Sequence, residues 1–167
     1  EKAGKLELLQ GNYQESLKHY RTLANLQGDK ISYQAILGLV DSLLGVNMPK
    51  AARERLLSLP EDKKTLPDSR FRMGQALLAM DDRESAEKEL MEVIEVDPQF
   101  SQAYVMLSNI FQKKGDLTQA IKILDKGREA HPKSQQILNA LGQLYLQKGD
   151  LQGAETIFQE AREVDPD

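Results

Sequence analysis

The side chains best suited to catalysis or metal binding are few and scattered in this sequence. Its two histidines, His19 and His131, each lack a second ligand at the spacing of a metal site, and we expect both to be exposed. No serine or threonine has a histidine partner, and the glycines do not form a phosphate-binding loop. Carboxylates three residues apart fall near the ends of predicted helices, on an outer face where they contact water: Glu92 with Glu95, and Glu160 with Glu163. The sequence therefore predicts a protein that is not an enzyme and that holds no metal or cofactor.

Amide side chains recur at helical spacing and suit a different chemistry, the binding of a peptide backbone. An amide donates and accepts at once, so a column of amides can pair with both backbone groups of an extended peptide. Apolar neighbours would add anchors, and basic neighbours would attract an acidic group. We predict a partner-binding groove within 67–147, lined by Phe71, Arg72, Gln75, Gln102, Val105, Met106, Asn109, Gln112, Lys113, Gln136, Asn139, Gln143 and Gln147. The competing interpretation is that these amides only keep an open surface soluble.

A repeat of thirty-four residues determines how such a groove would be built. Eight positions of 101–134 recur in 135–167: Tyr104, Leu107, Ser108, Phe111, Gly115, Ala120, Leu124 and Pro132 correspond to Leu138, Leu141, Gly142, Tyr145, Gly149, Ala154, Phe158 and Pro166. The same offsets hold in 67–100, at Met73, Gly74, Leu77, Ala86, Leu90 and Pro98. Self-similarity at this period indicates a stacked array, in which each unit buries its apolar face against its neighbours.

The region 31–66 follows the repeat less regularly. Gly38 and Gly45 fit one frame. Ala52 and Leu56 fit a frame that lies two residues later, as if the turn near 47–50 were longer. We interpret this region as a degenerate copy.

Residues 1–30 contain a further copy that is incomplete. Gly4, Gly11 and Tyr20 have the right mutual spacings, but the first helix of this copy would begin before Glu1. We therefore expect a piece of a longer protein, with one array over 1–167 that consists of a truncated repeat 1–30, the degenerate repeat 31–66, and the repeats 67–100, 101–134 and 135–167.

Each clear copy also predicts its own local structure. Apolar residues three and four apart form one stripe of a first helix, and a small residue such as Gly142 leaves room for a second helix to approach. Gly115 and Gly149 suit the left-handed residue after a helix. Asp116 and Asp150 follow them and can accept hydrogen bonds from the free amides that open the next helix. Short turns of this kind make the two helices antiparallel.

These residues and offsets resemble the tetratricopeptide repeat (TPR), over nearly the whole chain, although the tryptophan that often opens the family pattern is absent. The resemblance implies an all-α fold: a right-handed superhelix of antiparallel helical hairpins whose first helices line a concave side. It also implies a scaffold that binds a protein or peptide segment in that groove. In chaperone-binding members, lysine, asparagine and arginine clamp a terminal carboxylate. Asn109 matches that asparagine, but Val105 stands where a lysine would be, so we do not expect the clamp.

Composition limits the class of partner. A net charge of −4 argues against nucleic acid or an acidic membrane as the main partner, because those surfaces are bound by clustered lysine and arginine. No apolar run is long enough to insert into a bilayer. The absence of cysteine excludes disulfides and thiolate metal sites but leaves the cellular compartment open.

Two other functions are compatible with the array. The first is self-assembly, in which an uncapped last hairpin with partly exposed Ile157 and Phe158 would contact a second copy. The second is a recruiting arm of a larger enzyme or of an envelope or secretion protein, where bacterial relatives commonly occur. Concentration-dependent size would distinguish a self-assembling protein from a monomeric scaffold.

Overall fold

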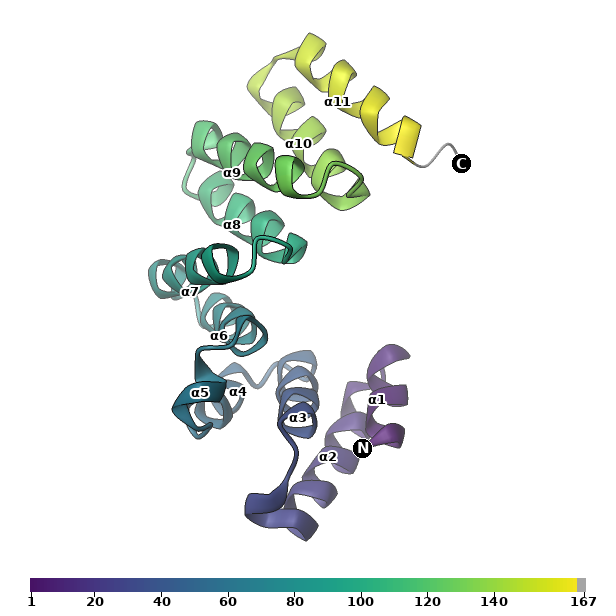
Figure 1. The fold of residues 1–167 in the computed structure, drawn as a ribbon, viewed down its shortest axis with the longest axis vertical. Helices are drawn as coiled ribbons and strands as arrows, with labels where there is room; N and C mark the ends of the chain where they lie inside the picture. The colour runs from purple at the N-terminus through teal and green to yellow at the C-terminus, as the bar shows by residue number, and fades with distance from the viewer. Residues whose placement is uncertain (165–167) are drawn as a thin grey trace. The chain divides into compact units, whose positions relative to one another are not determined.

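The computed structural model describes residues 1–164, apart from the side chain of Asp29, so the predicted closing Pro166 lies outside the described residues. Within this range the chain is helical and contains no strand. Figure 1 shows the helices in order: α1 (Lys2–Leu9), α2 (Tyr13–Gln27), the short 3₁₀ helix η1 (Gly28–Lys30), α3 (Tyr33–Gly45), α4 (Pro49–Leu57), α5 (Glu61–Lys64), α6 (Pro67–Ala79), α7 (Arg83–Val96), α8 (Ser101–Lys113), α9 (Leu117–Ala130), α10 (Gln135–Lys148) and α11 (Leu151–Val164). The predicted all-α class is confirmed.

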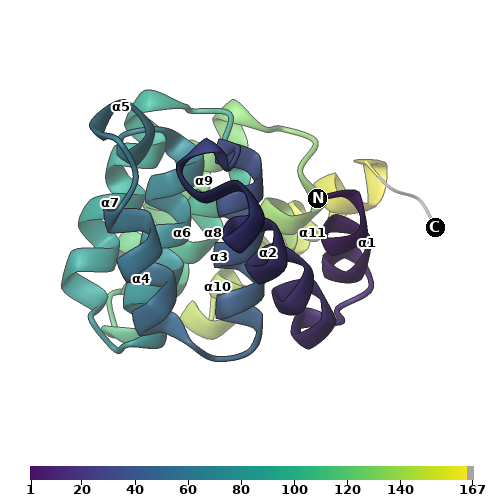
Figure 2. The ribbon, with the colours of Figure 1, turned by 90° about the horizontal axis from the view of Figure 1, so that it is seen from below.

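The chain forms two compact units, Glu1–Glu89 and Leu90–Asp167, with a boundary inside α7. In the N-terminal unit, α2 packs against α1 and α3, as Figures 1 and 2 show, and α6 packs against α3 and α4. In the C-terminal unit, α8 packs against α9, α9 against α10 and α10 against α11. The predicted division into five copies stays a prediction.

The tight turns between paired helices have the geometry that the sequence predicts. Gly115 and Gly149 are left-handed, with φ of 80° and 81°. Asp116 Oδ1 accepts a hydrogen bond from the backbone N–H of Gln119 at 3.0 Å, and Asp150 Oδ1 accepts one from that of Gly153 at 2.9 Å. Each aspartate satisfies one of the amides that a helix start leaves without an intrahelical partner. The expected glycine turns and aspartate caps are therefore confirmed.

The degenerate copy differs from its prediction in where the extra residues lie. The left-handed residue is Asn47, with φ of 58°, and α4 begins two residues after it, as α9 begins two residues after Gly115. The expectation of a longer turn near 47–50 is therefore wrong. The later frame holds for both helices of this copy, and the two additional residues lie upstream, where α2 is one residue longer than α9 and η1 leads into α3.

Large rings of second helices pack on glycines of first helices, where a Cβ atom would block the approach. A Cβ built on Gly142 of α10 would lie 2.6 Å from Cε1 of Phe158 on α11. A Cβ on Gly38 of α3 would overlap the ring of Tyr20 on α2. Because real Cβ atoms do not approach other atoms this closely, these helix pairs depend on glycine. The predicted role of Gly142 is confirmed.

The exposed face of α11 is mostly polar. Ile157 is 4% exposed, so the expectation that it is partly bare is wrong; Phe158 is half-buried over Gly142. Exposed positions of α11 are Leu151, Gln152, Glu155, Thr156, Gln159, Arg162 and Glu163. Within 151–164, the apolar surface of α11 that a second copy could contact is limited to Leu151 and the accessible parts of Phe158 and Val164.

We expect Gly142→Leu to lower the free energy of unfolding by about 1–3 kcal/mol, because the larger side chain would displace the ring of Phe158 and separate α10 from α11. Chemical denaturation measures the loss. Gln143→Leu, at the next and exposed position of α10, is the matched control and should change stability much less. Equal stability of Gly142→Leu and the unmodified protein would show that this contact does not hold the hairpin together.

Candidate functional site

The C-terminal unit presents the predicted amide row on its first helices, α8 and α10. Side chains three and four residues apart on one helix share a face, which is why the row is continuous along each helix. The exposed members are Gln102, Asn109, Lys113, Gln136, Asn139, Gln143 and Gln147, and the half-buried members are Val105, Met106 and Gln112. Val105 and Met106 thus keep part of their apolar surface available beside the amides. We call these residues the amide row.

One hydrogen bond joins the two helices within the amide row. Gln112 Nε2 on α8 donates to Gln147 Oε1 on α10 at 2.6 Å. Each of these amides retains a second donor hydrogen or further acceptor capacity. The pair therefore fixes two side chains of the row without using all of their hydrogen-bonding groups.

The three predicted site residues of the N-terminal unit lie on α6, and two of them have other roles. Phe71 is 7% exposed, so the expectation that it is an accessible apolar anchor is wrong. It occupies the buried stripe of α6 together with Gly74 and Leu77. Gln75 is half-buried. Arg72 is paired with two carboxylates of its own unit.

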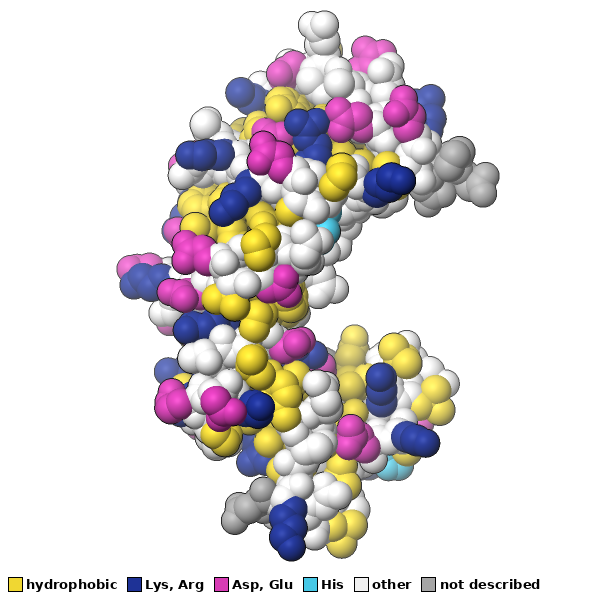
Figure 3. Space-filling model, in the orientation of Figure 1, with side chains coloured by type: hydrophobic (Ala, Val, Ile, Leu, Met, Phe, Trp, Pro, Cys, Tyr) yellow, Lys and Arg dark blue, Asp and Glu magenta, His cyan; other side chains and the backbone are white. Residues whose placement is uncertain are grey.

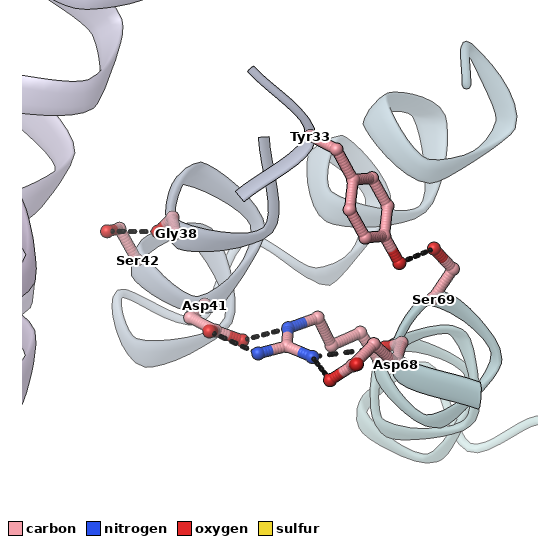
Figure 4. Close-up of polar contacts among 7 residues, drawn as sticks. Tyr33, Gly38, Asp41, Ser42, Asp68 and Ser69 are labelled. Carbon is pink, nitrogen blue, oxygen red and sulfur yellow. Dashed lines mark hydrogen bonds and ion pairs between the residues drawn. The ribbon is translucent and has the colours of Figure 1, made fainter. Parts of the chain in front are cut away.

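Arg72 connects α6 to α3. Its Nε and Nη2 donate to the two carboxylate oxygens of Asp41 at 2.7 and 2.8 Å, and its Nη1 donates to Asp68 Oδ1 at 3.1 Å (Figure 4). Burial alone would lower the pKa of Arg72, but the hydrogen bonds and charges of Asp41 and Asp68 outweigh burial and raise it. Two carboxylates of its own unit already balance the charge of Arg72, which argues against the expectation that it attracts an acidic group of a ligand.

A groove in the N-terminal unit was not among the predicted sites. It encloses about 530 Å³ between α1, α2, α3 and α6 and is lined by Glu1, Lys5, Leu8, Leu9, Tyr13, Tyr20, Gln34, Leu37, Gly38, Asp41 and Arg72. Figure 3 shows apolar side chains among basic ones over α1, where Leu9 is 78% exposed. Burial, followed by the charges of Glu1 and Asp41, raises the pKa of Tyr20 in this groove. We call it the N-terminal groove.

The repeat could have located the N-terminal groove. Gln34, Leu37 and Asp41 precede Gln102, Val105 and Asn109 by two full periods. Lys5 and Leu8 continue the series one copy earlier, once the two additional residues near η1 are counted. The uncertain frame of 31–66 concealed this correspondence.

Side chains suited to metal binding do not cluster among the described residues. No cluster of three or more histidine, aspartate or glutamate side chains could hold a metal ion in this range. His19 is exposed as expected, whereas His131 is half-buried. Its ring lies edge-on to that of Tyr104, with 6.4 Å between the two ring centroids. Glu160 accepts hydrogen bonds from Arg128 at 3.1 Å. No described helix is long and apolar enough to span a membrane.

Family models agree with the hairpin geometry. Two models described as tetratricopeptide repeat match residues 67–100 and 111–167. The chain is a TPR protein. No curated protein sequence matches it.

Solved structures show the same fold at low identity. A thermophilic TPR protein of Thermus thermophilus is 18% identical, covers 99% of this chain and 89% of its own, and gives a TM-score of 0.79. MamA of Desulfovibrio magneticus RS-1 is also 18% identical, with coverages of 99% and 92% and a TM-score of 0.75. YrrB, described as a TPR protein with an unusual peptide-binding site, is 17% identical, with coverages of 98% and 84% and a TM-score of 0.62. The fold of a TPR solenoid is therefore shown.

We expect Arg72→Met to lower the free energy of unfolding by about 1–3 kcal/mol, because it removes charge-assisted hydrogen bonds that join α6 to α3. Asp68→Asn should cost less than about 0.5 kcal/mol, since the Arg72–Asp68 pair lies on one helix and Asp68 is 55% exposed. Chemical denaturation of both variants checks the difference. A larger loss for Asp68→Asn than for Arg72→Met would contradict this assignment.

Proposed function

We propose that this TPR protein is a non-catalytic scaffold that binds an extended peptide or protein segment on the amide row of α8 and α10. TPR proteins are generally protein-interaction modules without catalytic activity, and their domains bind protein or peptide partners. The observation that carries the proposal is the exposure of Asn109, Asn139 and Gln143 on first helices of one unit.

The amide row would recognise the backbone of its ligand. Asn109, Asn139 and Gln143 each offer a carbonyl oxygen and two N–H donors to solvent-facing space. An extended peptide alternates the complementary groups, so its binding needs little side-chain specificity. Each such hydrogen bond contributes about 0.5–1.5 kcal/mol net, because both groups exchange water for each other. Several bonds acting together are needed for a useful affinity.

Two neighbours of the amides would add direction to binding. Met106 retains apolar surface and has an unbranched side chain that adapts to different ligand shapes. Lys113 is exposed at the end of α8, so its charge can attract an acidic ligand group. An apolar contact near Met106 and an acidic group near Lys113 would orient the segment along α8.

The N-terminal groove supports the same proposal from a second unit. Its lining residues Gln34, Leu37 and Asp41 occupy the repeat positions of Gln102, Val105 and Asn109. Gln34 is exposed and Asp41 is half-buried, but Leu37 is 2% exposed, so the two units share only part of this first-helix face.

Affinity capture from an extract of the source cells tests the proposal. The unmodified protein is compared with a triple variant, Asn109→Ala, Asn139→Ala and Gln143→Ala, after circular dichroism shows that the variant is folded. Three lost hydrogen bonds should reduce retention of a specific partner by at least about tenfold.

A second triple variant is the matched control. Gln119→Ala, Gln152→Ala and Gln159→Ala removes the same number of exposed amides from the second helices α9 and α11. This control should retain the partner at the level of the unmodified protein. Equal retention by the first variant, or loss with the control alone, would move the binding site away from the amide row.

A further inference from the structure

The N-terminal unit has a second pocket that shares no lining residue with the N-terminal groove. It encloses about 610 Å³ and is lined by Ala24, Asn25, Gly28, Ile31, Tyr33, Ile36, Arg55, Ser58, Leu59, Pro60 and Lys63. These residues come from α2, η1 and the residue after it, the start of α3, α4, the segment between α4 and α5, and α5. A volume of this size is within the range of small-ligand and short-peptide sites. We call it the Arg55 pocket.

The Arg55 pocket exists where the chain departs from the repeat. The second helix of a regular copy, such as α9, runs for 14 residues. In this copy α4 ends after nine residues at Leu57, and Pro60 separates it from the four-residue α5. The residue before a proline is forced out of the helical region, so the helix cannot continue through Leu59. Gly28, which also lines the pocket, has a φ of 52° and turns the chain out of α2.

The charged side chains that line the pocket are both basic. They are Arg55 and Lys63, and no described acidic side chain lines it. Arg55 Nε is buried and has no hydrogen-bond partner among the described residues. The carbonyl dipoles in the last turn of α4 favour a cation there, but they leave this N–H without an acceptor. A buried donor of this kind is stabilised when a ligand supplies the acceptor.

Lys63 is positioned at the same pocket with its charge largely available. Its Nζ lies 5.8 Å from the centroid of the Tyr33 ring and 3.4 Å from Asp62 Oδ2. Asp62 is 71% exposed, so this ion pair is screened by water and is weak. Lys63 and Arg55 therefore give the pocket a positive potential.

The remaining lining is apolar and partly fixed. Ile31, Ile36 and Leu59 supply aliphatic surface. The Tyr33 hydroxyl is hydrogen-bonded to Ser69 Oγ on α6 at 2.8 Å, as Figure 4 shows, so the ring is held in place. A fixed ring loses little conformational entropy when a ligand packs on it.

We propose that the Arg55 pocket binds a short acidic and apolar peptide segment of a partner protein. A carboxylate of the segment accepts from Arg55 and contacts Lys63, while a neighbouring apolar side chain packs on Ile31, Ile36 and the Tyr33 ring. The cations and the apolar surface of the pocket are spread over several elements. A peptide segment with alternating acidic and apolar side chains can contact both, whereas a single small anion cannot. This site is distinct from the amide row, which would recognise the ligand backbone.

Nuclear magnetic resonance titration of the ¹⁵N-labelled chain tests the pocket with a defined probe. The probe is an acetylated and amidated pentapeptide in which three leucines alternate with two glutamates. Resonances of Ile31, Ile36 and Lys63 should shift on titration. A matched peptide with glutamines in place of the glutamates should bind at least about tenfold more weakly, because it lacks the carboxylates.

Two variants connect the binding to the pocket cations. Arg55→Gln should weaken binding of the acidic peptide by about tenfold, whereas Arg53→Gln, on the same helix at an exposed position outside the pocket, should change it by less than about twofold. If Arg55→Gln does not fold, Lys63→Gln provides the same comparison. Undiminished binding by Arg55→Gln or Lys63→Gln, equal binding of the two peptides, or shifts confined to other residues would overturn the proposal.

Discussion

In each unit, an aromatic ring of a second helix packs closely on a glycine of a first helix. The geometry of the helix pair depends on the missing Cβ atom of that glycine. Phe158 packs on Gly142, and Tyr20 packs on both Gly4 and Gly38. Because these rings fill the space between helices, the opposite side of each first helix is left facing solvent. The amide row is exposed for this reason, because the side chains between its members are buried in the core.

Polar contacts then fix the neighbouring elements of each unit more specifically. In the N-terminal unit, Arg72 joins Asp41 to Asp68, and Tyr33 is bonded to Ser69. In the C-terminal unit, Gln112 is bonded to Gln147. The contacts of Arg72 and of Gln112 use side chains at predicted groove positions, so copies of the repeat differ in how much of their first-helix face is available.

The sequence predicted regular copies better than irregular ones, for physical reasons. Gly115 with Asp116, and Gly149 with Asp150, encode a left-handed turn and a helix cap locally, so their roles can be predicted from neighbouring residues alone. The pairing of Arg72 with Asp41 and the burial of Phe71 depend on packing between α6 and other helices, which spacing within one copy does not specify. The Arg55 pocket arises from Pro60 and from the two additional residues near η1. In the sequence, both look only like a copy of the repeat that has lost its regular pattern.

Site-directed photo-crosslinking in an extract of the source cells tests the central claim, that partners bind the first-helix face of the C-terminal unit. Benzoylphenylalanine is placed at Gln143 on α10 in one protein and at Gln159 on α11 in another, since both glutamines are exposed. The account predicts a discrete cross-linked partner at Gln143 and none at Gln159. Cross-linking at Gln159 alone, or equally at both positions, would contradict it.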